Sequence, residues 1–180
     1  MSDKTYKDLI TESMEMIASL DNSIFCGQAV SVEGTAMRST LINVPTDKLI
    51  EFPVDEDFQM GFCTGMAISG FLPICIFPRW NFLLVATNQI VNYLDKLNDL
   101  TKLNPPPKVI IRTAVGSKLP LNPGIQHTGD YTDAFKILVD NINVVRLDDK
   151  SQIKSEYVKA VTRNDGVSTI LVEQSDLYNS

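Results

Sequence analysis

The sequence predicts an α/β protein with three α/β/α layers around a doubly wound, mainly parallel sheet. Short apolar runs of strand length alternate along the chain with longer segments whose apolar residues recur at helical spacing. No hairpin dipeptide lies between two apolar runs, so the strands are expected to be joined by helical crossovers. In such a sheet, ligands bind at the carboxyl ends of the strands. With 180 residues and no internal repeat, residues 1–180 are expected to form a single domain.

The first half of the chain alternates between the two kinds of element. Helices are expected where apolar residues recur every three or four positions, and Thr5 or Asp3 can cap the first of them. Strands are expected where short apolar runs end at Gly27 or Pro53. The segment 29–46 is polar and weakly patterned, which indicates a long functional loop with about one helical turn. The expected elements are a helix at 6–20, strands at 23–26 and 48–52, a helix at 56–69 and a strand at 72–77.

The second half begins with the most strongly amphipathic segment of the sequence, a helix expected over 81–97. The prolines in 104–107 predict a stiff connection to an apolar strand, and the loop at 116–129 holds the only histidine. The apolar face of the first helix is expected to contain Phe82, Val85, Ala86, Ile90, Tyr93 and Leu97. The remaining expected elements are strands at 108–115, 143–147 and 167–172, and helices at 130–139 and 151–163.

Charge and cysteine content exclude several classes of protein. The net charge is −6 with only 16 Lys and Arg, which argues against a nucleic-acid-binding protein. Cys26, Cys63 and Cys75 lie in apolar contexts and are expected to be buried, free thiols in a reducing compartment.

The polar start of the chain shows no signal peptide. Ser69-Gly70 and Pro73 interrupt the most apolar run, which therefore predicts core rather than a membrane span. The sequence thus favours a cytoplasmic protein.

The most informative stretch is an acidic cluster at 55–57 followed by a helix that contains Gly61 and Gly65 and ends near Gly70. A carboxylate at a helix N-terminus is favoured by the macrodipole and by backbone donors. The glycines allow a backbone or a flat ring to approach closely. We interpret this combination as a cofactor site with Glu56 as its main candidate. Two simpler interpretations stay open, a first-turn acid that complements the dipole and glycines that serve close helix packing.

His127 is the other candidate for chemistry. It follows a strand in a loop, where it is either a surface residue or a catalytic one. Arg79, Trp80 and Phe82 open a helix, and their aromatic rings are either core or a wall on which a heteroaromatic ring stacks. The sequence contains no P-loop, no G-x-G-x-x-G, no G-x-S-x-G and no His/Asp/Glu metal cluster. This chain is therefore expected to bind no metal, and to contact any cofactor with only part of that cofactor's surface.

Taken together, these segments resemble the pyrimidine-binding, transketolase-like domain of thiamine-diphosphate enzymes. The resemblance is strongest to the beta subunit of 2-oxo acid dehydrogenases, and it covers nearly the whole chain. Transketolase shares the Glu-x4-Gly-x3-Gly core of the pattern. The matching residues are Pro53-Val54-Asp55-Glu56, the glycines at 61, 65, 70 and 116, Leu72 to Cys75, Asn81-Phe82, Gln89 to Asn92, Val109 to Arg112, Gln126-His127 and Leu171 to Glu173.

The resemblance implies a role for five residues. Glu56 matches the family's catalytic glutamate, which hydrogen-bonds a ring nitrogen of the cofactor's aminopyrimidine. Phe82 matches the aromatic residue packed on the pyrimidine, and Val54 matches a hydrophobic neighbour of that ring. His127 matches an active-site histidine that contacts the substrate or intermediate. Gln28 lies where the family usually has a glutamate near the pyrimidine.

The resemblance also implies partners. The Gly-Asp-Gly…Asn segment that binds magnesium and diphosphate in this family is missing, as is the carboxy-terminal domain of the beta subunits. We therefore expect a pyrimidine-binding subunit that shares thiamine diphosphate with an alpha-type, diphosphate-binding subunit, which would hold Mg²⁺. The expected reaction is decarboxylation of a 2-oxo acid or aldehyde transfer from a ketose. An exposed apolar face should support a homo- or hetero-oligomer. The alternatives are a non-catalytic or regulatory remnant that acts as a binding partner, and a truncated part of a longer beta subunit.

Overall fold

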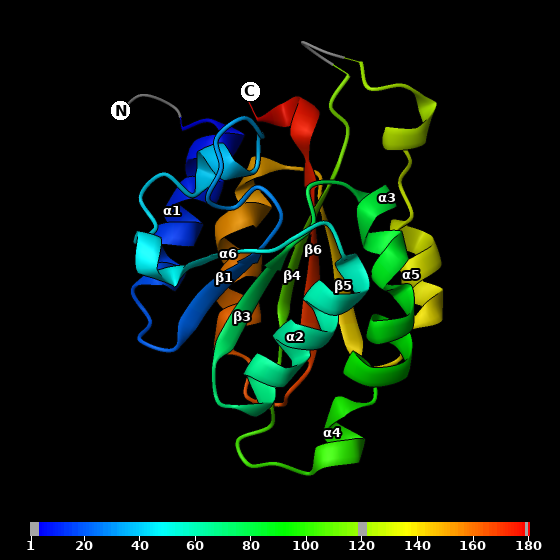
Figure 1. Cartoon of the computed structure of the whole chain (residues 1–180). Helices are drawn as coiled ribbons and strands as arrows, with labels where there is room; N and C mark the ends of the chain where they lie inside the picture. The colour runs from blue at the N-terminus through cyan, green and yellow to red at the C-terminus, as the bar shows by residue number, and fades with distance from the viewer. Residues whose placement is uncertain (1–3, 119–121, 179) are drawn as a thin grey trace.

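A six-stranded parallel sheet forms the centre of the protein (Figure 1). The computed structural model describes residues 4–118, 122–178 and 180, and the strand count refers to these residues. All five pairings between neighbouring strands are parallel, in the order β2-β1-β3-β4-β6-β5. The predicted α/β class and all six predicted strands are confirmed. The strands are β1 (Ser23–Gly27), β2 (Leu49–Glu51), β3 (Leu72–Ile76), β4 (Ile110–Val115), β5 (Ile142–Leu147) and β6 (Ser168–Gln174).

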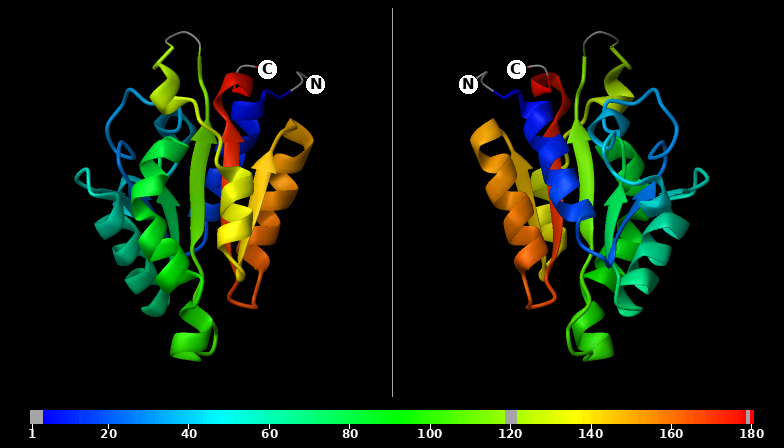
Figure 2. Two further views of the ribbon diagram at one scale, coloured as in Figure 1. Left: turned by 90° about the vertical axis from the view of Figure 1, so that its right-hand side faces the viewer. Right: turned by 90° about the vertical axis from the view of Figure 1, so that its left-hand side faces the viewer.

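Helices cover both faces of the sheet and make the three predicted layers. On one face α1 packs beside α6, and on the other face α2 packs beside the helical segment that follows β3, mainly along 84–94 (Figure 2). Each layer is sealed against the sheet by its own cluster of buried apolar side chains, and burial of apolar area is the main term that holds such layers together. The helices are α1 (Tyr6–Ala18), α2 (Glu56–Ile68), α3 (Trp80–Leu83), α4 (Leu97–Thr101), α5 (Thr132–Leu138) and α6 (Lys150–Thr162).

The first helix begins where its capping residue predicts. Thr5 accepts a hydrogen bond from the backbone N–H of Asp8, and the Asp8 carboxylate accepts one from the backbone N–H of Thr5. This reciprocal pair satisfies two backbone donors that would otherwise lack partners at the helix start. Of the two predicted capping residues, Thr5 is therefore the one that caps α1.

The prediction of one regular helix over 81–97 is wrong. The segment consists of α3, a 3₁₀ turn η3 (Leu84–Ala86), a π-helical turn η4 (Gln89–Leu94) and the separate helix α4. The wider π turn is closed by the bond from the Asp95 N–H to the Ile90 carbonyl at 2.9 Å. A π turn rotates the following side chains away from the 3.6-residue period. Tyr93, within the π turn, is accordingly exposed although predicted on the buried face. Val85, in the η3 turn before it, is exposed as well, whereas Ile90 is buried as predicted.

The long loop predicted over 29–46 is held by a carboxylate. It contains two short 3₁₀ turns, η1 (Arg38–Thr40) and η2 (Thr46–Lys48). The Glu51 carboxylate, at the end of β2, accepts hydrogen bonds from the backbone N–H groups of three successive loop residues and from the Ser31 hydroxyl. The start of this loop is thus fixed to the sheet edge by one side chain. The three loop donors belong to Ala29, Val30 and Ser31.

A charged pair is buried in the core beneath the η1 turn. Arg112 on β4 donates to both oxygens of Glu173 on β6, at 2.7 and 3.1 Å, and also to the Thr40 hydroxyl. The hydroxyls of Tyr157 and Tyr178 donate to the same carboxylate. All five side chains are buried. Each Glu173 oxygen therefore receives two donors, which compensates the cost of burying its charge.

Two further predictions concern the chain as a whole. Cys26, Cys63 and Cys75 are buried and free, as predicted. Within the part of the chain that the structure describes, no helix is long and apolar enough to cross a membrane.

Candidate functional site

Four of the five predicted site residues follow four strands of the sheet at the same edge. Gln28 follows β1, Glu56 follows β2 at the start of α2, Phe82 follows β3 in α3, and His127 lies in the loop after β4. Because the strands are parallel, their carboxyl ends share one edge, which is the edge where doubly wound sheets bind ligands. The residues that the sequence singled out therefore gather at the expected end of the molecule.

The backbone at the end of β1 leaves no room for a side chain before Gln28. A Cβ on Gly27 would lie 2.4 Å from the Ile76 carbonyl oxygen, so only glycine fits this position. The Gly27 carbonyl also accepts a hydrogen bond from the Phe52 N–H at 2.8 Å, which continues the pairing of β1 with β2. This contact sets Gln28 beside the turn that leads into α2.

Glu56 is the first residue of α2 and is only 6% exposed. Asp55 caps the helix by accepting a hydrogen bond from the Phe58 N–H at 3.0 Å, so the Glu56 side chain is not needed as the cap. Among the described residues, no hydrogen bond or ion pair reaches the Glu56 carboxylate. The Glu56 oxygens are not among the buried, unpaired atoms of the described residues, so the small exposed part of this side chain includes its carboxylate end. A mostly buried side chain whose charged end stays open to solvent can accept a hydrogen bond from a ligand.

Phe82 and His127 are brought together, as a shared site requires. Their ring centroids are 5.7 Å apart and the rings are inclined by 33°. The Asn81 amide nitrogen lies 3.0 Å from His127 Nδ1. Arg79 Nη1 donates to the His127 carbonyl at 3.1 Å and to the Gly116 carbonyl. Three neighbouring residues at the start of α3 therefore hold the histidine loop against the sheet edge.

The remaining site residues show where the site is incomplete. The Gln28 Nε2 atom is buried and has no hydrogen-bond partner in the described structure. Val54 is 79% exposed on the turn before α2. No hydrogen bond or ring contact within the described residues joins Glu56 to the Phe82 or His127 ring. In this single chain the predicted residues form one open wall rather than an enclosed pocket.

Of the three residues predicted at the start of α3, Trp80 belongs to the core. It is buried, and its ring packs on Phe135 with centroids 4.9 Å apart and on the edge of Tyr131. For Trp80 the core interpretation is therefore confirmed. Phe82 is only half-buried and faces His127, so the two aromatic residues have different positions despite their closeness in sequence.

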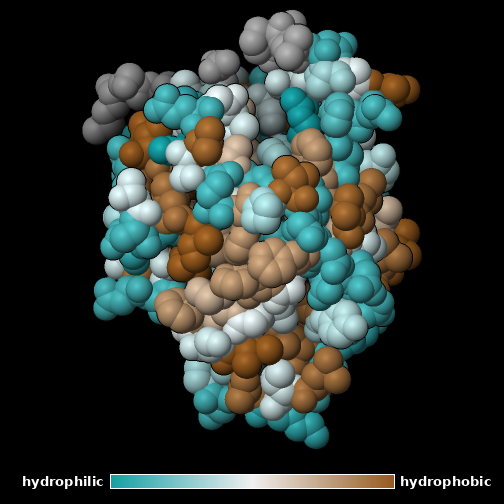
Figure 3. Space-filling view, viewed as in Figure 1, coloured by the Kyte–Doolittle hydropathy of each residue, from teal (hydrophilic) through white to brown (hydrophobic). Residues whose placement is uncertain are grey.

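Aromatic side chains form an exposed apolar patch on α2. Phe58 and Phe62 are one helical turn apart, 48% and 38% exposed, and both rings contact the buried Phe52 ring. Figure 3 shows apolar side chains gathered over α2 on this face of the molecule. Together with Val54, this α2 patch borders the turn that carries Glu56. Exposed aromatic clusters of this kind mark interaction surfaces.

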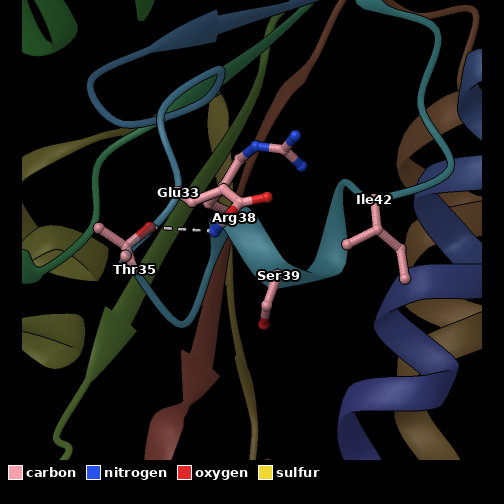
Figure 4. A pocket seen from close by; sticks show the side chains of 6 residues that line it. Glu33, Thr35, Arg38, Ser39 and Ile42 are labelled. Atoms are coloured by element: carbon pink, nitrogen blue, oxygen red, sulfur yellow. Dashed lines mark hydrogen bonds between the residues drawn. The ribbon is translucent and has the colours of Figure 1, made fainter.

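Two cavities lie over the loop between β1 and β2. The larger, of about 450 Å³, is lined by η1 and its approach, and its lining includes neither Glu56 nor His127 (Figure 4). There the Thr35 hydroxyl accepts the Arg38 N–H, and the Arg38 side chain extends away from Thr35. The second cavity, of about 270 Å³, borders Arg79 and Ser117 and therefore adjoins the histidine loop. The lining of the larger cavity is Glu33, Gly34, Thr35, Arg38, Ser39 and Ile42.

The family model described as "Transketolase, pyrimidine binding domain" matches residues 2–180 of the chain. This chain belongs to that family. The similarity to transketolase-like domains and to 2-oxo acid dehydrogenase beta subunits predicted from the motifs is confirmed.

Two curated relatives of this family member are dehydrogenase subunits. The chain is 25% identical over 153 residues to the 3-methyl-2-oxobutanoate dehydrogenase subunit beta of Mycobacterium tuberculosis, covering 76% of the chain and 42% of that protein. It is 25% identical over 181 residues to the mitochondrial pyruvate dehydrogenase E1 component subunit beta of Caenorhabditis elegans, covering 98% and 50%. The chain thus spans half or less of the length of these relatives.

Solved structures show the same fold. A split-gene transketolase described as an inactive beta4 tetramer superposes with a TM-score of 0.70 at 13% identity, covering 95% of this chain and 51% of that one. A putative thiamin diphosphate-dependent enzyme from Mycobacterium smegmatis superposes with a TM-score of 0.62 at 14% identity, covering 98% and 32%.

Sequence reasoning missed the contacts that this family member makes around its histidine. The sequence singled out Asn81 only as part of a matching motif, and Arg79 only as a neighbour of aromatic residues. Their contacts with His127 join segments 46 and 48 residues apart, which no local spacing predicts. The available signal was the polar pair that flanks Trp80 at the carboxyl end of a buried strand.

Proposed function

We propose that this chain is the pyrimidine-binding subunit of a two-chain thiamine-diphosphate enzyme that acts on a 2-oxo acid or a ketose. The observation that carries the proposal is the Glu56 side chain, 6% exposed at the start of α2, whose carboxylate end is open to solvent and has no donor among the described residues. Membership in the family and the dehydrogenase beta subunits among the relatives support the cofactor and the substrate class. In this proposal the whole of residues 1–180 is one pyrimidine-binding domain of a cytoplasmic enzyme.

The residues present fit the pyrimidine end of this cofactor. An aminopyrimidine offers N–H donors and a flat apolar ring. Glu56 supplies an acceptor without a donor of its own, and Phe82 supplies a half-buried aromatic face. Gln28 has a buried amide nitrogen without an acceptor, which matches a ring nitrogen lone pair. Val54, exposed in the single chain, would be covered once the cofactor and a partner close over the turn.

Each residue would contribute positioning rather than covalent chemistry. When bound, thiamine diphosphate supplies the nucleophilic carbon for cleaving a carbon–carbon bond next to a carbonyl group. Glu56 would accept a hydrogen bond from a ring nitrogen when that nitrogen carries a proton, and so orient the pyrimidine. Phe82 would pack on the ring and exclude water from it. His127, held beside Phe82, would contact an oxygen of the substrate.

A second subunit would complete the site. The described chain offers one open wall and, among the residues described, no group of three His, Cys, Asp or Glu side chains arranged to hold a metal ion. An alpha-type subunit would therefore bind the diphosphate and hold Mg²⁺. The α2 patch of Phe58 and Phe62 borders Glu56 and is the natural contact surface for another subunit. Decarboxylation and aldehyde transfer are both compatible with this arrangement.

Reconstitution tests the proposal. The chain is mixed with candidate diphosphate-binding subunits encoded beside it, with thiamine diphosphate and Mg²⁺, and assayed with 2-oxo acids and ketoses. We expect turnover from the pair and none from either chain alone. Glu56→Gln should abolish turnover while assembly, measured by size-exclusion chromatography, is kept. Asp57→Asn is the matched control, because Asp57 bonds Gln89 on its own surface and should leave turnover within about threefold.

The same experiment addresses the second candidate function, a non-catalytic binding partner of the same fold. The uncharged Gln28 at the pyrimidine edge is the observation that favours it. A pair that assembles with cofactor yet shows no turnover, with or without Gln28→Glu, would support this second function and contradict the first.

A further inference from the structure

The contact between Asn81 and His127 has a direction that the structure can assign. The Asn81 amide nitrogen lies 3.0 Å from His127 Nδ1, within hydrogen-bond distance. The other ring nitrogen, Nε2, makes no hydrogen bond to any described residue. The tautomer of a histidine is set by the bond that one of its nitrogens makes. Asn81 is therefore the residue that decides which atom His127 offers to a ligand.

The burial of the amide favours one of its two orientations. An asparagine amide can present either its NH₂ group or its oxygen to Nδ1. As placed, NH₂ faces the ring and Oδ1 is buried without a partner. The exchanged orientation would move two N–H donors into that buried position in place of one oxygen. Orphaned buried donors are rarer in proteins than under-satisfied carbonyl oxygens, so the orientation with NH₂ toward the ring is preferred.

The ring itself has little freedom to avoid this contact. Arg79 holds the His127 carbonyl at 3.1 Å, and the His127 N–H bonds the Gly124 carbonyl at 3.1 Å. Phe82 packs beside the ring with centroids 5.7 Å apart. The backbone on both sides of the imidazole and one of its faces are therefore fixed before any ligand arrives.

We propose that Asn81 is a positioning residue that holds neutral His127 as the Nε2–H tautomer. The amide N–H needs a lone pair on Nδ1, so the ring proton resides on Nε2. His127 then presents a hydrogen-bond donor rather than a base. The identity of the acceptor rests on the proposed function: this donor would bond a carbonyl or carboxylate oxygen of a 2-oxo acid or ketose.

Nitrogen NMR of the whole chain tests the tautomer directly, because the sequence has a single histidine. Long-range ¹H–¹⁵N spectra of the ¹⁵N-labelled chain, recorded at about pH 8.5, above the ordinary titration range of an imidazole, separate bare from protonated ring nitrogens. We expect a bare Nδ1 and a protonated Nε2 in one tautomer, not the average of a free imidazole. Asn81→Asp should reverse the pair, since a carboxylate accepts from Nδ1–H.

Asn88→Asp is the matched control, because Asn88 is exposed and bonds Asn92 rather than the histidine. It adds the same charge and should leave the wild-type tautomer unchanged. A protonated Nδ1 in the wild-type chain, or an Asn81→Asp spectrum equal to that of Asn88→Asp, would overturn the assignment. The wild-type spectrum decides the tautomer even if Asn81→Asp does not fold. Because no cofactor or partner is added, the result is separate from the success or failure of the proposed enzyme activity.

Discussion

Two buried carboxylates in this protein have opposite surroundings. Glu173, on the central strand β6, receives two donors from Arg112 and one hydroxyl each from Tyr157 and Tyr178. Glu56, at the start of α2, is nearly as buried but receives no donor from the described residues. The Glu173 carboxylate is compensated inside the core, whereas the Glu56 carboxylate is open to solvent and has no partner within the described residues.

The difference separates groups that stabilise the fold from groups reserved for binding. Buried polar atoms in native proteins are nearly always paired, so an unpaired one needs a specific explanation. Two such atoms, the Gln28 amide nitrogen and the Asn81 amide oxygen, lie at the sheet edge, and others, such as the Thr113 and Thr169 hydroxyls, lie on the central strands. The core network has one such atom, Nη1 of Arg112, among groups that are otherwise paired. We infer that the unpaired polar groups at the sheet edge are available to a ligand.

The largest expected effect is on the core network. Glu173→Gln leaves the buried Arg112 guanidinium without its counter-charge and should lower the free energy of unfolding by about 3–5 kcal/mol. Urea unfolding followed by circular dichroism measures the change. Glu156→Gln, which removes a surface pair with Lys159, is the control and should cost less than about 1 kcal/mol. Equal effects in the two variants would show that the core pair does not stabilise the fold.

The tyrosines of the network should make the protein sensitive to alkali. Burial raises the pKa of Tyr157 and Tyr178, and also that of Tyr6, which stacks on Tyr178 beside the network; the Glu173 carboxylate raises each further. Because these pKa values are raised in the folded state, their stabilising contribution is complete below the unfolded value of about 10 and is lost as pH rises above it. At pH 11 the loss is about 1 kcal/mol or more per tyrosine.

Urea unfolding between pH 8 and 11 measures this loss, and Tyr178→Phe should make the decline shallower. Stability that stays constant from pH 9 to 11 would contradict the buried, neutral state assigned to these hydroxyls.

A smaller effect on stability is expected from Glu51, which holds the loop at 29–31. Partial burial raises the pKa of Glu51, but hydrogen bonds from Ser31 and its two preceding neighbours outweigh this and hold it below the usual value. Because the pKa of Glu51 is lowered in the folded state, this carboxylate stabilises the fold above about pH 4.3. That contribution to the free energy of unfolding is lost as the pH falls through the pKa of the folded state. Glu51→Gln should cost about 1 kcal/mol, given the exposure of the group.

Amide hydrogen exchange measures the outcome for the loop at 29–31. We expect faster exchange there in Glu51→Gln at pH 7, and similar exchange in both proteins once the wild-type carboxyl is protonated. Unchanged protection at neutral pH would show that the carboxylate does not hold the loop.

The smallest expected change in stability belongs to Glu56. Glu56→Gln removes no internal partner, so the free energy of unfolding should change by less than about 1 kcal/mol, either way. Urea unfolding under the conditions used for Glu173→Gln makes the two glutamates directly comparable. A loss of several kcal/mol would mean that Glu56 serves the fold and would remove the contrast between the two carboxylates.

Local patterns predicted the sheet and the edge that carries the site. Short apolar runs gave all six strands, and the acidic cluster before the glycine helix identified Glu56. The Arg112–Glu173 pair could not be predicted, because it joins positions 61 residues apart and the strand around Arg112 reads as apolar. The π turn η4 was not predicted either, because apolar spacing does not distinguish a π turn from a regular helix. The Asp95 carboxylate after the turn accepts hydrogen bonds from the backbone of Asp140 and Asn141, 45 and 46 residues away. Contacts across the fold, rather than periodicity, decide these features.

The proposed function depends on thiamine diphosphate binding to Glu56. The most direct measurement is a structure of the chain assembled with its diphosphate-binding subunit, thiamine diphosphate and Mg²⁺. We predict one Glu56 carboxylate oxygen within about 2.6–3.2 Å of a ring nitrogen of the aminopyrimidine, with Phe82 against the ring. A cofactor bound elsewhere, or a Glu56 side chain turned away from it toward this chain's own core, would contradict the account.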